Sequence, residues 1–80
     1  MSKALYRREN EIFLNLIRKL RNDAKLTQAE CSSALGRPQS FVSDVERGVR
    51  RLDIIQLRDY CEVLGLSLPD FVAMLEEAIG

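Results

Sequence analysis

Short polar side chains that can exchange hydrogen bonds at fixed geometry gather between Pro38 and Gly48. Val42 and Val45 have the spacing of the buried side of a helix there. A glutamine amide can pair with adenine, a serine hydroxyl can bond a base or a phosphate, an aromatic ring can pack on a thymine methyl group, and a carboxylate can accept from cytosine. A solvated helix face is the alternative for such a set. The side chains left facing outward are Gln39, Ser40, Phe41, Ser43, Asp44 and Arg47.

A second short helix is predicted just before this segment. Thr27 and Glu30 form the pattern of a capping box, in which each side chain bonds the backbone N–H of the other. Cys31 and Leu35 then lie four residues apart on one helical face. Gly36 stands where a helix ends by turning left-handed, a conformation that glycine adopts without steric cost. The two short helices and their tight turn therefore run from Thr27 to Gly48.

Three further helices are expected around this pair. The first runs from about Leu5 to Ala24, the fourth begins at a cap formed by Asp53 and Gln56 and ends near Leu64, and the fifth begins at Ser67. No strand pattern or internal repeat divides the chain, so residues 1–80 are predicted to form one all-α domain of five helices. The apolar stripes of the three helices are Leu5, Ile12, Phe13, Leu16, Ile17 and Leu20; Ile54, Ile55, Leu57, Tyr60, Cys61 and Leu64; and Phe71, Val72, Leu75 and Ile79.

Composition indicates a soluble globular protein. Hydrophobic residues make up 46% and charged residues 30% of the 80 positions. No apolar run reaches the roughly 20 residues of a membrane span. The N-terminal segment MSKALYRREN has charges where a signal peptide needs an apolar core, so a cytoplasmic location is expected.

The residue types needed for catalysis or metal binding are scarce. The chain has no histidine, and its two cysteines, Cys31 and Cys61, do not form a CxxC pair. A structural zinc site needs four nitrogen or sulfur ligands, so two reduced core thiols are expected instead. No phosphate-binding loop or recognisable carboxylate pair is present. An enzyme is therefore not expected, nor a metal, a cofactor or a small-molecule ligand.

Charge is unevenly distributed along a chain whose formal net charge is zero. Through Leu26 there are seven basic and three acidic residues, whereas from Leu52 onward there are one and six. A nucleic-acid binder is usually basic overall. The asymmetry is nevertheless compatible with a DNA face at one end of the molecule and a partner face at the other.

The chain resembles the Cro/Xre class of helix-turn-helix proteins, the phage-repressor-like DNA-binding domains. The residues that carry the resemblance are LTQAE at Leu26–Glu30, ALG at Ala34–Gly36 and FVSDVERG at Phe41–Gly48, and it continues through Arg50–Leu52 into YCEVLGLSLPDF at Tyr60–Phe71. It implies a compact five-helix, lambda-repressor-like domain whose helix-turn-helix is formed by helices 2 and 3. Helix 3 would then lie in the major groove of double-stranded DNA.

The resemblance also assigns individual residues. Positions matching Gln39, Ser40 and Asp44 face the bases in related repressors, and the position of Gln28 meets a phosphate. Arg21 and Glu46 match a buried ion pair between the first and third helices. The expected phosphate partners around the same surface are Arg37, Arg47, Arg50 and Arg51.

Three residues depart from the family pattern. Lys25 stands where a glycine is common before LTQ. Either the backbone is left-handed there, which costs about 1–2 kcal/mol for a lysine, or the loop takes another shape. Arg37 stands where the family usually has an aliphatic residue in the turn, so either the turn loses an apolar anchor or the stem of the arginine covers the gap. Asp44 is acidic where many relatives are basic or carry an amide, so it would either accept from cytosine or repel a phosphate.

A DNA-binding domain of this size is expected to bind DNA as a two-fold dimer on half-sites about one DNA turn apart. The fifth helix is the predicted dimer interface because its stripe is more apolar than a small core requires. The alternative is that the stripe only covers the fourth helix. The predicted interface residues are Leu68, Phe71, Val72, Leu75 and Ile79.

Two functions remain open. The first is a sequence-specific transcriptional regulator of the phage-repressor or restriction-modification controller type, which the segment RPQSFVSDVERGVRRLD most resembles. The second is a protein-interaction module on the same fold, antitoxin-like or partner-binding, with weak DNA affinity. The zero net charge and Asp44 favour the second.

Overall fold

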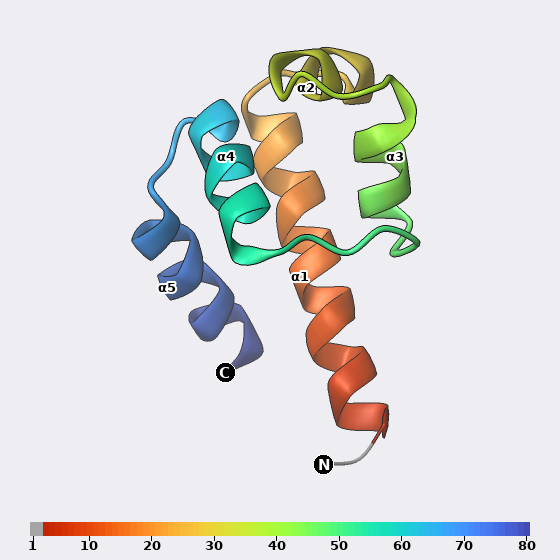
Figure 1. Cartoon of the computed structure of the whole chain (residues 1–80). Coiled ribbons are helices and arrows are strands. Elements are labelled where there is room, and N and C mark those ends of the chain that lie inside the picture. The colour runs from red at the N-terminus through yellow and green to blue at the C-terminus, as the bar shows by residue number, and fades with distance from the viewer. Residues whose placement is uncertain (1–2) are drawn as a thin grey trace.

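Helices follow one another along the part of the chain that the structure, a computed structural model, describes, which is residues 3–80. Within that part there are five helices and no strand (Figure 1). The sequence patterns predicted this order and number. The helices are α1 (Lys3–Asp23), α2 (Gln28–Ala34), α3 (Ser40–Glu46), α4 (Ile54–Leu64) and α5 (Leu68–Ile79).

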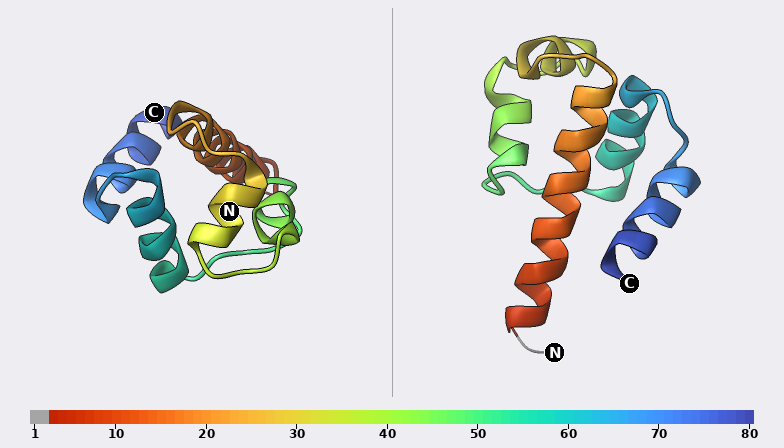
Figure 2. Two further views of the ribbon diagram at one scale, coloured as in Figure 1. Left: turned by 90° about the horizontal axis from the view of Figure 1, so that it is seen from above. Right: turned by 180° about the vertical axis from the view of Figure 1, so that it is seen from behind.

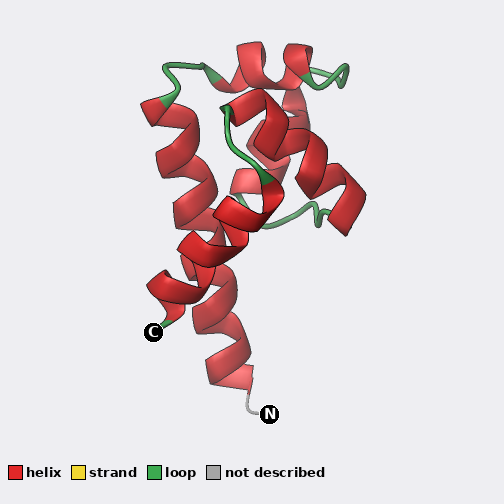
Figure 3. Ribbon diagram, turned by 90° about the vertical axis from the view of Figure 1, so that its left-hand side faces the viewer, coloured by secondary structure: helices red, strands yellow, loops and turns green. Residues whose placement is uncertain are grey.

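The long helix α1 runs through the middle of the molecule (Figures 1 and 2). α3 lies on one side of it, α4 and α5 lie on the other, and α2 crosses its C-terminal end. The N-terminal turns of α1 extend beyond the other helices, and the side chain of Leu5 lies outside the described residues. The loop of residues 47–53 carries the chain from α3 across to α4, and the other connections are shorter (Figure 3).

The core gathers side chains from all five helices. Phe13 of α1 meets Phe71 of α5 edge to face, with ring centroids 5.8 Å apart, a geometry that aromatic pairs favour. No described helix is long and apolar enough to cross a membrane. The buried apolar residues are Ile17, Cys31, Phe41, Val42, Val45, Tyr60, Cys61, Leu64 and Phe71.

The predicted apolar face of α4 is wrong at its first turn. Ile54 and Ile55 were expected to be buried, but 59% and 63% of their surfaces are exposed. α4 packs through Leu57, Tyr60, Cys61 and Leu64. Ile55 lies on the opposite side of the helix from that stripe, and Ile54 is the first residue of α4, at the end that the stripe does not reach.

The structure also removes part of the dimer interface that was predicted on α5. Phe71 is completely buried in the core, so it is not available to a second molecule. Leu68 and Leu75 are half-buried and pack against the same core, which was the alternative considered for this stripe. Val72 remains 41% exposed.

Four of the helices end in the same way, with one residue in the left-handed conformation. These residues are Lys25 after α1, Gly36 after α2, Gly48 after α3 and Gly65 after α4, with φ between 60° and 84°. In each case the next amide bonds a carbonyl five residues back, as in a Schellman motif. Lys25 is the one non-glycine residue with positive φ among those described, so the α1 terminus carries the strain that the sequence raised as a possibility.

Candidate nucleic-acid interface

The predicted reading face of α3 is largely open to solvent. Successive residues turn by about 100° around a helix, so Ser40, Ser43, Asp44 and Arg47 share one side. Ser40 and Arg47 are exposed, and Ser43 and Asp44 are half-buried. The exposed residue Gln39 stands at the N-terminal end of this face, and its side chain makes no cap hydrogen bond.

Phe41 does not belong to this face, contrary to the prediction. Its side chain is only 6% exposed and forms part of the core with Val42 and Val45. The side of α3 that packs inward is thus wider than the two valines indicated, and the ring cannot reach a thymine methyl group. Two arginines instead lie over the ring: the guanidinium carbon of Arg37 is 5.2 Å and that of Arg50 is 5.0 Å from its centroid.

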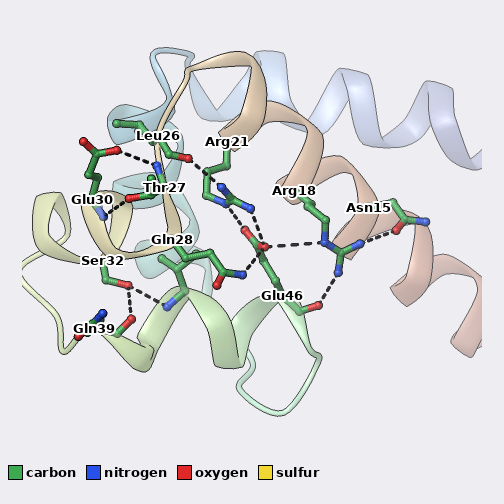
Figure 4. A network of polar contacts seen from close by, with 11 residues as sticks. Asn15, Arg18, Arg21, Leu26, Thr27, Gln28, Glu30, Ser32, Gln39 and Glu46 are labelled. Atoms are coloured by element: carbon green, nitrogen blue, oxygen red, sulfur yellow. Dashed lines mark hydrogen bonds and ion pairs between the residues drawn. The ribbon is translucent and has the colours of Figure 1, made fainter.

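Ser32 joins the two helices of the motif, a role that the sequence analysis missed. The residue is completely buried, and its Oγ accepts from the amide of Val42 at 3.0 Å and donates to the carbonyl of Gln39 at 3.2 Å (Figure 4). One hydroxyl therefore satisfies two backbone groups at the start of α3. The sequence feature that pointed to this role was a polar residue, Ser32, directly after the expected core residue Cys31 on a short amphipathic helix.

A buried ion pair connects α1 with the C-terminal end of α3. Arg21 Nε donates to Glu46 Oε2 at 2.6 Å, and Arg21 Nη2 donates to Oε1 at 3.1 Å. Only 3% of Glu46 is exposed. The third donor of the guanidinium, Nη1, bonds the carbonyl of Leu26 at 2.7 Å, so Arg21 also fixes the loop that leads to α2. The ion pair that the family resemblance implied is present.

Gln28 and Arg18 complete this cluster, which we call the Glu46 network (Arg18, Arg21, Gln28 and Glu46; Figure 4). Gln28 Nε2 donates to Glu46 Oε1 at 2.9 Å. Arg18 donates to the carbonyl of Glu46 at 2.9 Å, and its Nε lies 3.7 Å from Oε1. The Arg18 contact was not predicted, although its position three residues before Arg21 places both on one face of α1.

The network shifts the ionisation of both partners of the ion pair. Burial by itself would raise the pKa of Glu46, but the hydrogen bonds from Arg21 and Gln28 and the positive charges of Arg21 and Arg18 together hold this pKa below its ordinary value. The hydrogen bond to Glu46 also raises the pKa of Arg21. Both directions favour the charged pair.

The half-buried residue Gln28 was expected to meet a phosphate. One amide hydrogen is used by Glu46, so the second is the one available for an anion. The side chain lines an open hollow of about 700 Å³ between α2 and α3. The hollow is also lined by Arg21, Thr27, Ala29, Gln39, Ser40 and Ser43.

Asp44 and Arg47 form an ion pair on the reading face, with Arg47 Nη2 2.5 Å from Asp44 Oδ1. The side chain of Arg47 is 67% exposed and that of Asp44 is 36% exposed. The pairing compensates the acidic charge that departed from the family pattern. It also occupies Arg47, one of the four predicted phosphate partners.

Comparison with known proteins gives the following similarities. The sequence pattern of the helix-turn-helix family matches residues 17–71. An uncharacterised HTH-type transcriptional regulator of Sinorhizobium fredii is 34% identical over 59 residues, which are 74% of this chain and 77% of that protein.

Two solved structures extend the similarity to the whole fold. An XRE-family like protein from Pseudomonas syringae pv. tomato superposes with a TM-score of 0.86 at 37% identity, over 94% of this chain and 92% of that one. A wild-type restriction-modification controller protein superposes with a TM-score of 0.80 at 25% identity, over 89% of this chain and 93% of that one. The matched region includes α2 and α3, the two helices of the motif.

Proposed function

Because this chain belongs to the Cro/Xre family of helix-turn-helix transcriptional regulators, we propose that it binds double-stranded DNA sequence-specifically with α3 in the major groove. The observation that carries the proposal is the uncovered face of α3, with Gln39, Ser40 and Ser43 presented beside an open hollow. These side chains hydrogen-bond bases, and the groove admits a helix of this diameter.

The residues around that face have separate tasks in this proposal. Gln39 and Ser40, at the N-terminal end of α3, contact base edges, where recognition helices make most of their specific contacts. Ser43 and Asp44 lie further along the face, and Asp44 accepts from cytosine when Arg47 turns toward a phosphate. Gln28, Arg37, Arg50 and Arg51 contact phosphates and fix the register of the protein on the duplex.

The proposed regulator acts as a homodimer on a palindromic operator. A reading face of five residues per molecule (Gln39, Ser40, Ser43, Asp44 and Arg47) makes too few contacts for one site in a genome. The proposed interface is the outer part of α5, formed by Val72 with the half-buried residues Leu68, Leu75 and Ile79. Sedimentation at micromolar concentration tests this part, and a monomer throughout would contradict it.

Selection of bound duplexes from a random DNA pool, at low and then near-physiological salt, tests the DNA-binding proposal. We expect a two-fold-symmetric motif with half-sites about ten base pairs apart. Gln39→Ala should then relax the preference at one position of each half-site, where the loss of a bidentate pair costs about 1–3 kcal/mol. Recovery of no motif from either pool would contradict sequence-specific binding.

A protein-interaction module on the same fold is the second candidate. It is favoured by the pairing of Asp44 with Arg47, because this pairing removes one positive charge from the face that would meet DNA. The two candidates differ in their response to salt. Specific binding persists at near-physiological salt with a linear dependence of log affinity on log salt concentration, whereas a scaffold without DNA function would lose its weak affinity altogether.

A further inference from the structure

The ring of Phe41 carries two cations that come from different parts of the chain. Arg37 precedes α3 and Arg50 follows it, yet their guanidinium carbons lie 5.2 and 5.0 Å from the same ring centroid. A guanidinium within about 6 Å of an aromatic centroid is attracted by the negative face of the ring. Since the ring itself is 94% buried, it has a fixed position relative to α3. We call Phe41, Arg37 and Arg50 the Phe41 patch.

The two guanidinium groups of the patch have no carboxylate partner among the described residues. Arg18, Arg21 and Arg47, by contrast, each lie within 4 Å of a carboxylate oxygen. Two like charges near one ring repel each other, and the quadrupole of the ring offsets this repulsion only in part. A bound polyanion would relieve it. The patch is therefore suited to an anion that supplies more than one negative charge.

The patch borders the reading face on the side away from the Glu46 network. Around α3, Phe41 lies about 60° beyond Asp44, whereas Ser43 and Gln39 lie on the side of Gln28. The ring and Arg37 also line a small hollow with Leu35 and with Gln56 and Asp59 of α4, and the carboxylate of Asp59 forms no ion pair with either arginine of the patch. When α3 occupies a major groove, the sugar-phosphate backbone passes along both borders of its face.

We infer that Phe41 is a positioning residue that holds Arg37 and Arg50 together as a two-cation phosphate-binding site on the α4 side of the reading helix. The inference rests on the proposed function and adds to it the residue that orders the phosphate contacts on this side. Arginine side chains are long and flexible, and ordering one at an interface weakens binding by about two- to tenfold. Because the ring orders both side chains in the free protein, this loss of freedom does not have to occur on DNA binding.

Duplex-binding measurements on Phe41 variants test the inference. Phe41→Leu keeps an apolar side chain in the core but removes the aromatic face, so we expect binding to weaken by about two- to tenfold for each of the two arginines released. The loss should be equal on the selected operator and on an unrelated duplex, because phosphate contacts do not depend on sequence. Phe41→Tyr keeps the ring and should bind like the parent protein.

A double-mutant cycle separates positioning from packing. In the background Arg37→Gln plus Arg50→Gln, Phe41→Leu should cause no further loss of affinity. In the background Arg58→Gln, which removes an exposed positive charge on α4 beside α5, it should cause its full effect. An equal effect in both backgrounds would overturn the inference, since Phe41 would then act by packing alone. Failure of the parent protein to bind any duplex would instead overturn the proposed function.

A measurement without substitution keeps the inference testable if Phe41→Leu does not fold. In the proton NMR spectrum of the free parent protein, the side-chain Hδ resonances of Arg37 and Arg50 should be shifted upfield by the ring current of Phe41. Arg58, which does not lie over a ring, is the internal reference. Resonances of Arg37 and Arg50 that coincide with those of Arg58 would overturn the inference.

Discussion

The two sides of α3 use arginine in opposite ways. In the Glu46 network, Arg21 is 9% exposed and donates three hydrogen bonds, two to the carboxylate of Glu46 and one to the carbonyl of Leu26. In the Phe41 patch, Arg37 and Arg50 are exposed and lie against a ring without a carboxylate partner. The difference shows that arginine content around a motif does not measure its anion-binding capacity. Arg21, which holds α3 in place, has three of its N–H groups bonded inside the fold, whereas Arg37 and Arg50 have no carboxylate partner among the described residues.

Breaking the buried pair should have the largest effect on stability. Glu46→Gln and Arg21→Met each leave one buried group without its charged partner, which costs about 3–5 kcal/mol. For a domain of this size the melting temperature should fall by more than about 12 °C. Thermal unfolding followed by circular dichroism measures this. If either variant had an unchanged melting temperature, the ion pair between Arg21 and Glu46 would not stabilise the fold, and this comparison of the two sides of α3 would be wrong.

Acidification should weaken the Glu46 side selectively. Because the pKa of Glu46 in the folded chain lies below its ordinary value of 4.5, the unfolded chain takes up this proton first as pH falls. The stability that the carboxylate contributes is complete above about pH 4.5 and is lost as pH falls through the folded pKa. Urea unfolding should therefore show that the difference in the free energy of unfolding between the parent protein and Glu46→Gln becomes smaller as pH falls from 7 to 3.

Glu30 provides the control for that comparison. Hydrogen bonds within its capping box also lower the pKa of Glu30, so part of the acid sensitivity belongs to α2. This part is common to the parent protein and to Glu46→Gln and cancels in their difference. A difference that stays constant across the pH range would contradict the assignment to Glu46.

Relieving the strain beside Arg21 should stabilise the domain moderately. Lys25→Gly removes the side chain from a left-handed position at φ 60°. It should raise stability by up to about 1 kcal/mol, since the relief of about 1–2 kcal/mol is reduced by the greater freedom of glycine in the unfolded chain. Urea unfolding at pH 7 measures the change.

The matched control is Gly36→Ala, at φ 68°, where an added Cβ would meet no atom within 4 Å. Its cost arises from backbone conformation alone, so the two substitutions should shift stability in opposite directions by similar amounts. A destabilised Lys25→Gly variant would indicate that the lysine makes a contribution at this turn that outweighs its strain.

Removing the exposed charge pair should have the smallest effect on stability but a clear effect on DNA binding. Asp44→Asn breaks an exposed ion pair, worth about 0–1 kcal/mol. It frees Arg47, so non-specific duplex affinity should rise and the slope of log affinity against log salt should steepen by about 0.9 if Arg47 reaches a phosphate. An unchanged slope would mean that Arg47 remains away from the DNA backbone even without its carboxylate partner.

Much of the fold could be predicted because its signals are local. The capping box at Thr27, the cap formed by Asp53 and Gln56 and the left-handed helix end at Gly36 depend on residues a few positions apart, and the structure confirms each of them. The order of five helices follows from these starts and ends. The ion pair between Arg21 and Glu46 was available only through the family resemblance, because no local pattern connects residues 25 positions apart.

The tertiary structure decided which side of each helix is buried. Phe41 faces inward and Ile55 outward because the neighbours of α3 and α4 determine which part of each helix is covered, whereas the type of residue expresses only a preference. The same packing brings Arg18 and Gln28 to Glu46, and Arg37 and Arg50 to one ring. The sequence by itself thus determined where the helices begin and end, since those interactions span one turn. Contacts between helices span tens of residues, so only the folded chain could show which of the described arginines lie beside a carboxylate and which lie against the ring of Phe41.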